Sequence, residues 1–170
     1  MPKLHVCSLS RLEETVQRTG ARHVVTLLSD SSGVIRPEGI SEEQHLRLIA
    51  SDITEPLDGH ILPGTAHVEK LIGFVKAWDR QAPLVIHCWA GISRSTAAAY
   101  IAASILNPSL DEEDLATRLR AAAPSATPNP RLIALADSLL SRDGRMKKAI
   151  AAIGRGADAF EGTPFELVYD

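Results

Sequence analysis

The sequence predicts an α/β protein with a central, mainly parallel sheet of four or five strands and helices on both of its faces. Short apolar or β-branched runs alternate along the chain with longer helical patterns, and this alternation is typical of parallel strands joined by helices. The chain has 170 residues, of which 45% are apolar and 23% charged, an ordinary composition for one globular domain. We therefore expect residues 1–170 to form a single domain.

The first half of the chain contains three candidate strands. Residues 3–7 form a weak strand candidate, and a capping-box pattern that starts at Ser10 predicts a helix that ends at Gly20. The β-branched run "RHVVTLL", residues 22–28, predicts a buried strand. The alternating run "HLRLIA", residues 45–50, leads into a stretch rich in Asp, Pro and Gly that we expect to be a loop.

The second half begins with an amphipathic pattern over residues 65–78, which predicts a helix with one buried face. The continuous apolar run of residues 82–88 is typical of a strand covered on both sides. Residues 95–106 are apolar or small and predict a buried helix. A second capping-box pattern at Ser109 predicts another helix start, and Asn129 followed by proline predicts a third.

The C-terminal residues 143–170 give weaker signals. Residues 147–154 predict a short final helix. The tail "GADAFEGTPFELVYD" has no clear period, so it can dock on the domain, exchange with a second copy or stay loose. Its role and the oligomeric state are left open.

The charge pattern and the cysteine content exclude several classes of partner. The net charge is −3 and Lys and Arg form no cluster, so we expect no nucleic-acid or membrane partner. No secretion signal and no membrane-spanning apolar run is evident. Two cysteines, Cys7 and Cys88, are too few for a disulfide framework and fit a reducing cytoplasm. No residues have metal-ligand spacing, and we expect no cofactor.

The chemistry is concentrated in the stretch "LVIHCWAGISRS". The predicted strand delivers Cys88 to a turn at Gly91, and the next helix begins near Arg94. The free amides and dipole of a helix N-terminus bind anions and favour a thiolate over a thiol. The Arg94 guanidinium can bind two phosphate oxygens, and the Ser95 hydroxyl can hydrogen-bond the sulfur. We therefore expect the Cys88 thiolate to attack a phosphorus atom held by this loop.

The segment "HCWAGISRS" resembles the HCxxGxxR signature, followed by Ser or Thr, of the cysteine-dependent protein tyrosine phosphatases. The compact length is most similar to the dual-specificity branch, including its bacterial members. The resemblance covers residues 3–142. It implies a phosphorylated protein as substrate, phosphotyrosine above all, and no metal. It also implies that the substrate phosphate binds to Trp89, Ala90, Gly91, Ile92, Ser93 and Arg94.

The resemblance further implies an upstream aspartate that acts as general acid and then as general base. Asp52 follows the strand-like run "HLRLIA", and "SDITEP" resembles the acid loop of the family. Glu55 and Asp58 lie in the same predicted loop and are its rivals. We expect Asp52 to be the acid, because the end of a strand holds a side chain more rigidly than the middle of a loop.

Two more residues are expected to support the site. Asn129, in a Pro-Asn pair that opens a late helix, resembles a family asparagine that braces the phosphate loop, although a plain helix cap is the alternative. The His87 ring is expected to bond near the Cys88 backbone and to favour the charged sulfur. Trp89 and Ile92 either line the pocket mouth or pack inward.

Other functions remain as alternatives. The same chemistry can act on phosphoinositides, inositol phosphates or RNA ends, but the neutral loop side chains favour a less charged substrate. A phosphopeptide-binding module without activity would not need Cys88, Arg94 and Asp52 together. A rhodanese-like sulfur transferase would have no use for an acid loop. Cys7 is expected to be structural, with a protective disulfide to Cys88 under oxidation as the alternative.

Overall fold

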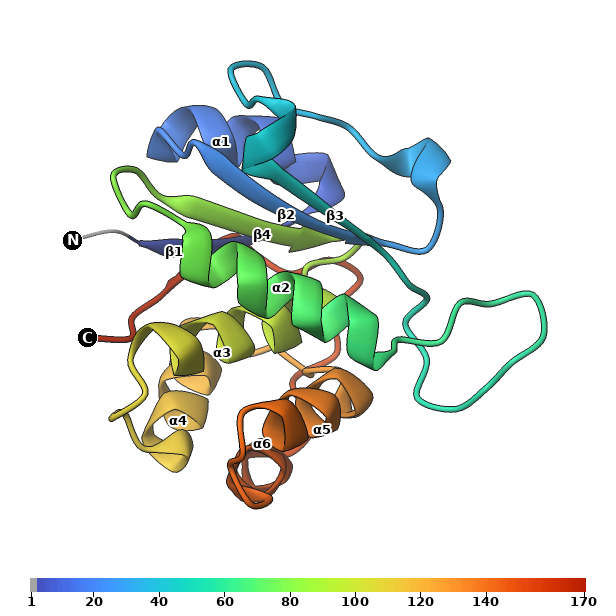
Figure 1. The fold of residues 1–170 in the computed structure, drawn as a ribbon, viewed down its shortest axis with the longest axis vertical. Helices are drawn as coiled ribbons and strands as arrows, with labels where there is room; N and C mark the ends of the chain where they lie inside the picture. The colour runs from blue at the N-terminus through green and yellow to red at the C-terminus, as the bar shows by residue number, and fades with distance from the viewer. Residues whose placement is uncertain (1–2) are drawn as a thin grey trace.

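The computed structural model describes residues 3–170 and contains a five-stranded sheet with helices on both faces (Figure 1). The strand order is β3-β2-β4-β1-β5, the first four strands are parallel, and β5 runs antiparallel to β1. The predicted fold class is confirmed, and the sheet has five strands. The strands are β1 (Leu4–Ser8), β2 (His23–Leu28), β3 (His45–Ile49), β4 (Leu84–Cys88) and β5 (Phe165–Leu167).

Within the described residues, six α-helices cover the sheet, most of them on one face. In Figure 1, α1 lies above the sheet and α2 to α6 lie below it. Each face has its own hydrophobic core, and the larger core lies between the sheet and α2 to α6. The helices are α1 (Leu12–Thr19), α2 (Thr65–Ala77), α3 (Arg94–Leu106), α4 (Glu112–Ala122), α5 (Pro130–Leu139) and α6 (Arg145–Ile153).

Helix α3 occupies the centre of the larger layer and is buried from Arg94 to Ser104, as its apolar and small residues predict. It contacts α2, α4, α5 and the strands β1 and β4. The alanines along α3 leave room for these neighbours. Tyr100 is fully buried, and its hydroxyl donates a 2.9 Å hydrogen bond to the Glu112 carbonyl. The helix that follows the cysteine loop is therefore held on several sides.

Both predicted capping boxes are wrong, because nearby groups compete for the serines. The Ser10 hydroxyl donates to the Glu161 carboxylate, and α1 follows a 3-10 turn that contains Ser10. The Ser109 hydroxyl donates to Asn107 Oδ1 at 2.8 Å. Helix α4 is capped by Asp111, whose carboxylate accepts two N–H groups of its first turn at 2.8 and 3.1 Å. A charged acceptor placed at the helix start replaces the serine cap.

The C-terminal tail is docked on the domain. Helix α6 spans Arg145–Ile153, close to the prediction, and β5 extends the sheet beside β1. Leu167 in β5 is 1% exposed and belongs to the larger core. The Glu166 carboxylate pairs with Lys3 at 3.0 Å. The edge of β1 is therefore covered by the tail of the same chain.

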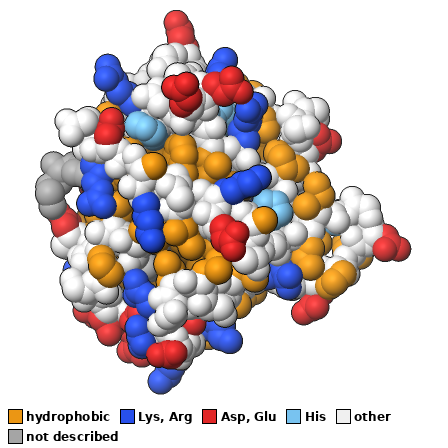
Figure 2. Space-filling model, in the orientation of Figure 1, with side chains coloured by type: hydrophobic (Ala, Val, Ile, Leu, Met, Phe, Trp, Pro, Cys, Tyr) orange, Lys and Arg blue, Asp and Glu red, His pale blue; other side chains and the backbone are white. Residues whose placement is uncertain are grey.

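The surface carries both signs of charge. On the face shown in Figure 2, Lys and Arg side chains alternate with Asp and Glu, and hydrophobic side chains lie between them. Within residues 3–170, no helix has the length and apolar character to cross a membrane.

Leu167→Ala tests the docking of the tail. Because Leu167 is 1% exposed, the substitution is expected to lower the free energy of unfolding by about 2–4 kcal/mol in urea denaturation. The matched control is Val168→Ala, since Val168 is 47% exposed and its loss should cost less than about 0.5 kcal/mol. Equal and small effects of both substitutions would show that β5 does not dock in solution.

Candidate active site

The connection from β4 to α3 places Cys88 at the end of a central strand. Its sulfur lies 3.0 Å from the Ser95 hydroxyl oxygen and 3.3 Å from the Gly91 nitrogen, and Cys88 is 2% exposed. Gly91 has a φ of 72°, and a Cβ there would lie 2.9 Å from the backbone of Cys7 and Ser8. Only glycine fits this turn, because a side chain would both strain the backbone and collide with β1.

The backbone N–H groups and carbonyl groups of the cysteine loop differ in their partners. Within residues 3–170, the N–H groups of Ala90, Ile92 and Ser93 have no acceptor. Backbone N–H groups left free in such a loop form a site for an anion. The carbonyls of Trp89, Ala90, Ile92 and Ser93 accept from the N–H groups of Leu9 (3.1 Å), Gly162 (2.8 Å), Thr127 (2.9 Å) and Asn129 (3.2 Å), respectively.

Arg94 is held by one end of its guanidinium and leaves another donor free. Its Nη1 donates to the Ser29 hydroxyl and to the Ala50 carbonyl, both at 3.0 Å. The residue is 8% exposed, and its Nε is buried without a partner in the described chain. A buried N–H of a charged group without an acceptor is costly. The free Nε therefore fits an oxyanion bound beside the loop.

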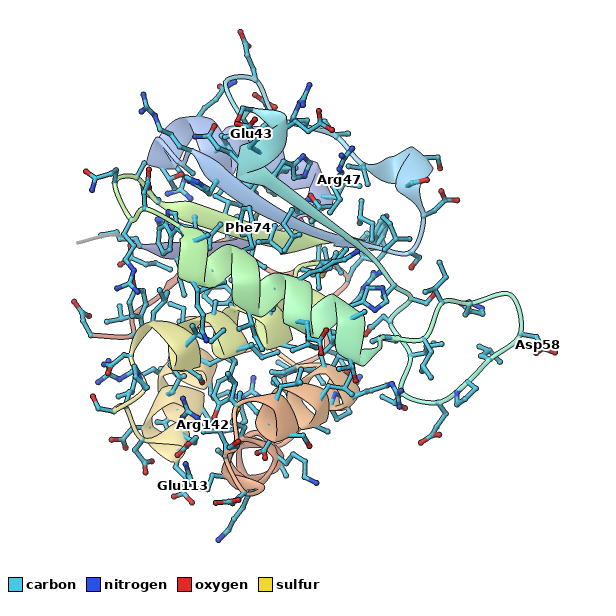
Figure 3. All side chains as sticks on the ribbon, viewed as in Figure 1. Glu43, Arg47, Asp58, Phe74, Glu113 and Arg142 are labelled. Carbon is cyan, nitrogen blue, oxygen red and sulfur yellow. The ribbon has the colours of Figure 1, made fainter. Side chains whose placement is uncertain are left out.

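The structure brings Asp52, but not Asp58, to the loop. Asp52 Oδ1 accepts from the Ser93 hydroxyl at 2.7 Å and from Asn129 Nδ2 at 2.9 Å. Its other oxygen accepts no hydrogen bond within residues 3–170. In Figure 3, Asp58 lies at the tip of the loop that follows β3 and points into solvent. Glu55 is also exposed.

The loop that contains Asp52 is closed at its base, which explains how Asp52 is positioned. The Ser51 N–H donates to the Ile61 carbonyl at 2.8 Å, and the Ile61 N–H donates to the Ser51 hydroxyl at 3.2 Å. Farther along, Arg131 Nε donates to the Pro63 carbonyl at 2.6 Å. Asp52 therefore lies at the closed base, while the rest of the loop extends outward.

Asn129 caps a helix with its side chain and contacts the cysteine loop with its backbone. Its Oδ1 caps α5 by accepting from the N–H groups of Arg131 and Leu132 at 3.0 and 3.1 Å. Its Nδ2 donates to Asp52, and its backbone N–H donates to the Ser93 carbonyl. The same residue thus joins the helix, the loop of Asp52 and the cysteine loop.

His87 lies at one end of a buried chain of hydrogen bonds. Its Nδ1 is 3.0 Å from the Cys88 carbonyl, so it donates there, and its Nε2 is 2.7 Å from the Thr26 hydroxyl. The Thr26 oxygen is also 2.7 Å from His45 Nε2. Burial lowers the pKa of His87 and of His45 to about 4 each. Both rings are neutral at pH 7.

Sequence reasoning missed this chain of contacts, because nothing in the local sequence marks His45 as a partner of Thr26. The signal lies in the alternation of the strands. Parallel pairing sets Thr26 beside His87, and His45 is the first residue of the neighbouring strand β3. Side chains on one face of adjacent strands meet, so the strand order would have been needed to find them.

Trp89 and Ile92 both lie at the mouth of the site. Trp89 is 52% exposed, and its ring meets the edge of Phe160 at a centroid distance of 5.4 Å and an angle of 84°. Ile92 lines a cavity of about 570 Å³ together with Asp52, Ser93 and the C-terminal residues up to Phe160. An open cavity therefore adjoins the cysteine loop and Asp52.

Cys7 is buried on the other side of the sheet. Ser8 pairs with Cys88 across β1 and β4, and successive residues of a strand point to opposite faces. Cys7 packs in the core with Leu12 and Val16, whereas Cys88 packs in the core below the sheet. Burial raises the pKa of the Cys7 thiol to about 12. A disulfide between the two would require the strands to rearrange, which supports the structural role.

The fold resembles those of known phosphatases, although no protein-family model and no curated protein sequence matches the chain. The crystal structure of DUSP15 aligns with a TM-score of 0.66 and 18% identity over 89% of this chain and 92% of that chain. Human DUSP28 aligns with a TM-score of 0.61 and 21% identity over 89% and 95%. PTPMT1 in complex with PI(5)P aligns with a TM-score of 0.57 and 17% identity over 88% and 93%.

The chain therefore has the fold of the dual-specificity and protein tyrosine phosphatases. The resemblance of the motif HCWAGISRS is confirmed at the level of the fold. The alignment with DUSP15 covers 89% of this chain, which is more than the residues 3–142 over which the sequence resembles the family. The identities are low, so the roles of individual residues depend on the geometry described above.

The buried histidines predict a loss of stability in acid. The pKa of each falls from 6.5 to about 4 on folding, so the unfolded chain binds more protons between these values. Stability is therefore full above pH 6.5 and falls toward pH 4, by about 2 kcal/mol for each histidine at pH 4.5. Urea denaturation across this range measures it. His45→Gln should make the free energy of unfolding less dependent on pH, whereas His60→Gln, at an exposed position, should leave that dependence unchanged. Equal pH dependence in the wild type and both variants would show that burial of His45 does not cause the loss of stability.

Proposed function

We propose that the chain is a cysteine-dependent phosphatase that hydrolyses phosphomonoesters, with phosphotyrosine in proteins as its main substrate. The observation that carries this proposal is the set of donors in the Cys88 loop and in Arg94 that have no acceptor within residues 3–170. They are the N–H groups of Ala90, Ile92 and Ser93 and the buried Nε of Arg94. A tetrahedral oxyanion satisfies donors arranged in this way, and the charge that develops on it during reaction is stabilised by them.

In the first step, the Cys88 thiolate attacks phosphorus and the ester P–O bond breaks. The electron pair of that bond goes to the leaving oxygen, which takes a proton from the carboxyl group of Asp52. Asp52 suits this role because Ser93 and Asn129 hold one of its oxygens, while the other accepts no hydrogen bond within residues 3–170. The product is a phosphocysteine and a free alcohol or phenol.

In the second step, water attacks the phosphocysteine while the Asp52 carboxylate accepts a proton from it. The S–P bond breaks, its electron pair returns to sulfur, and inorganic phosphate leaves. The Ser95 hydroxyl, 3.0 Å from the sulfur, stabilises the departing thiolate by donating to it. His87 and Asn129 act by positioning, since they contact the Cys88 carbonyl and Asp52.

Protein phosphotyrosine is preferred over phosphoinositide on the basis of charge. The loop side chains other than Arg94 are neutral, whereas a ligand with several phosphates requires several cations. PTPMT1, whose structure contains PI(5)P, has a similar fold, so phosphoinositides remain the second candidate. We also propose that the protein works in a reducing cytoplasm, which both free cysteines support.

Phosphate release from p-nitrophenyl phosphate tests the proposal. Cys88→Ser should abolish turnover, because the hydroxyl is a much weaker nucleophile at this site. Asp52→Asn should lower kcat by about 10²- to 10³-fold, the usual contribution of a general acid. Asp58→Asn is the matched control in the same loop and should keep kcat within about twofold of the wild type.

The outcomes separate the alternatives. Wild-type turnover no higher than that of Cys88→Ser would contradict the enzymatic proposal and favour a binding module. A large decrease of kcat in Asp58→Asn with no decrease in Asp52→Asn would assign the role of general acid to Asp58 instead of Asp52. Faster phosphate release from PI(5)P in vesicles than from a phosphotyrosine peptide would favour a lipid over a protein as the substrate.

A further inference from the structure

The residues between α6 and β5 run beside the cysteine loop. We call residues 155–162 the C-terminal segment. They lie beyond the part of the chain that carries the sequence motifs, and nothing in their composition marks them as part of a site. In the structure, however, this segment provides one side of the cavity that adjoins the loop. Asp52, Ile92 and Ser93 line the same cavity.

Hydrogen bonds hold the C-terminal segment at both ends. At its start, the Gly156 N–H donates to the Thr127 hydroxyl at 3.1 Å, and the Ala157 N–H donates to the Pro124 carbonyl at 2.9 Å. At its end, the Gly162 N–H donates to the Ala90 carbonyl at 2.8 Å, and the Glu161 carboxylate accepts from the hydroxyls of Ser8 and Ser10. The residues between these anchors are therefore held against the site.

The backbone of the segment passes unusually close to its neighbours. A Cβ on Gly162 would lie 2.8 Å from the Gly91 carbonyl oxygen, and one on Gly156 would lie 2.6 Å from the carbonyl group of Ser125. Side chains at these two positions would push the segment away from the loop. Glycine at both ends thus allows the close approach that places residues 157–160 on the cavity wall.

The wall offers an aromatic surface with balanced charge. Phe160 lines the cavity and is 81% exposed, and its ring lies against that of Trp89 from the loop. Exposed aromatic surface beside a cavity favours an apolar or aromatic ligand that covers it. The charged groups of the wall are Arg155 and Asp158, which pair with each other at 2.7 Å, so they add no excess of positive charge.

We infer that the C-terminal segment is the specificity-determining wall of the site, and that Phe160, supported by Trp89, binds the ring of an aryl phosphate such as phosphotyrosine. This inference rests on the proposed function and deepens it. Ile92 and Ser93 of the Cys88 loop line the same cavity as Phe160, so the ring of a phosphate ester bound at that loop can reach the wall. The balanced charge of the wall disfavours inositol phosphates for the same place.

The experiment compares ligands with and without a ring. In the Cys88→Ser background, calorimetry measures the Kd of O-phosphotyrosine, of inorganic phosphate and of inositol trisphosphate. Phe160→Ala should raise the Kd of O-phosphotyrosine by about five- to tenfold, the range expected for the loss of one aromatic contact with its burial. The Kd of inorganic phosphate should stay within about twofold. Phe160→Tyr, which keeps an aromatic ring, should retain most of the affinity for O-phosphotyrosine. In the wild-type background, Phe160→Ala should raise KM for a phosphotyrosine peptide and leave kcat nearly unchanged.

Three results would overturn the inference. If Phe160→Ala raises the Kd of phosphate and of O-phosphotyrosine equally, Phe160 acts only through the loop. If neither Kd rises, Phe160 does not bind the ring of the ligand. Tighter binding of inositol trisphosphate than of O-phosphotyrosine would assign the wall to a polyanion. Failure of the proposed function gives a different result, namely no phosphate release by the wild type, while the Kd comparison still reports on the wall. Thermal melting confirms that each variant is folded, as the exposure of Phe160 predicts.

Discussion

The arrangement of the site depends on where the carbonyl groups of the cysteine loop point. A short loop can direct its N–H groups inward only when its carbonyls face outward, and buried carbonyls require donors. Here the donors come from the turn before α1, the segment before α5 and the tail near Gly162. The anion site is therefore not a property of the loop alone. It forms when distant parts of the chain have packed around it.

The same constraint explains several positions of small side chains. Gly91 lies against the backbone of β1, and Gly162 lies against Gly91, so three segments are stacked with no side chain between them. Helix α3 starts directly after the loop and is buried in the larger core. Movement of α3 or β1 would displace the loop amides. Rigidity at the site thus comes from the packing of its neighbours, as pre-organised binding of charge requires.

Sequence reasoning located the local features and missed the long-range ones. The motif HCWAGISRS carries its own geometry, since strand, turn and helix follow each other directly. Asp52 could be placed next to the strand end by the same logic. By contrast, the pairing of Thr26 with His45 and His87 depends on strand order. The predicted cap at Ser10 was wrong because Glu161 binds its hydroxyl, and no local pattern reveals a partner so far along the chain.

The tail shows how support and selectivity can be joined in one segment. Its main chain satisfies the Ala90 carbonyl through Gly162, and its side chains line the cavity up to Phe160. These two contributions are chemically independent, because the first uses a backbone N–H and the second an aromatic ring. A chain can therefore change which ester it accepts by altering residues 157–160, provided that the glycine at the end of the segment stays. Proteins with the same fold but different substrates could diverge in this way without altering the cysteine loop.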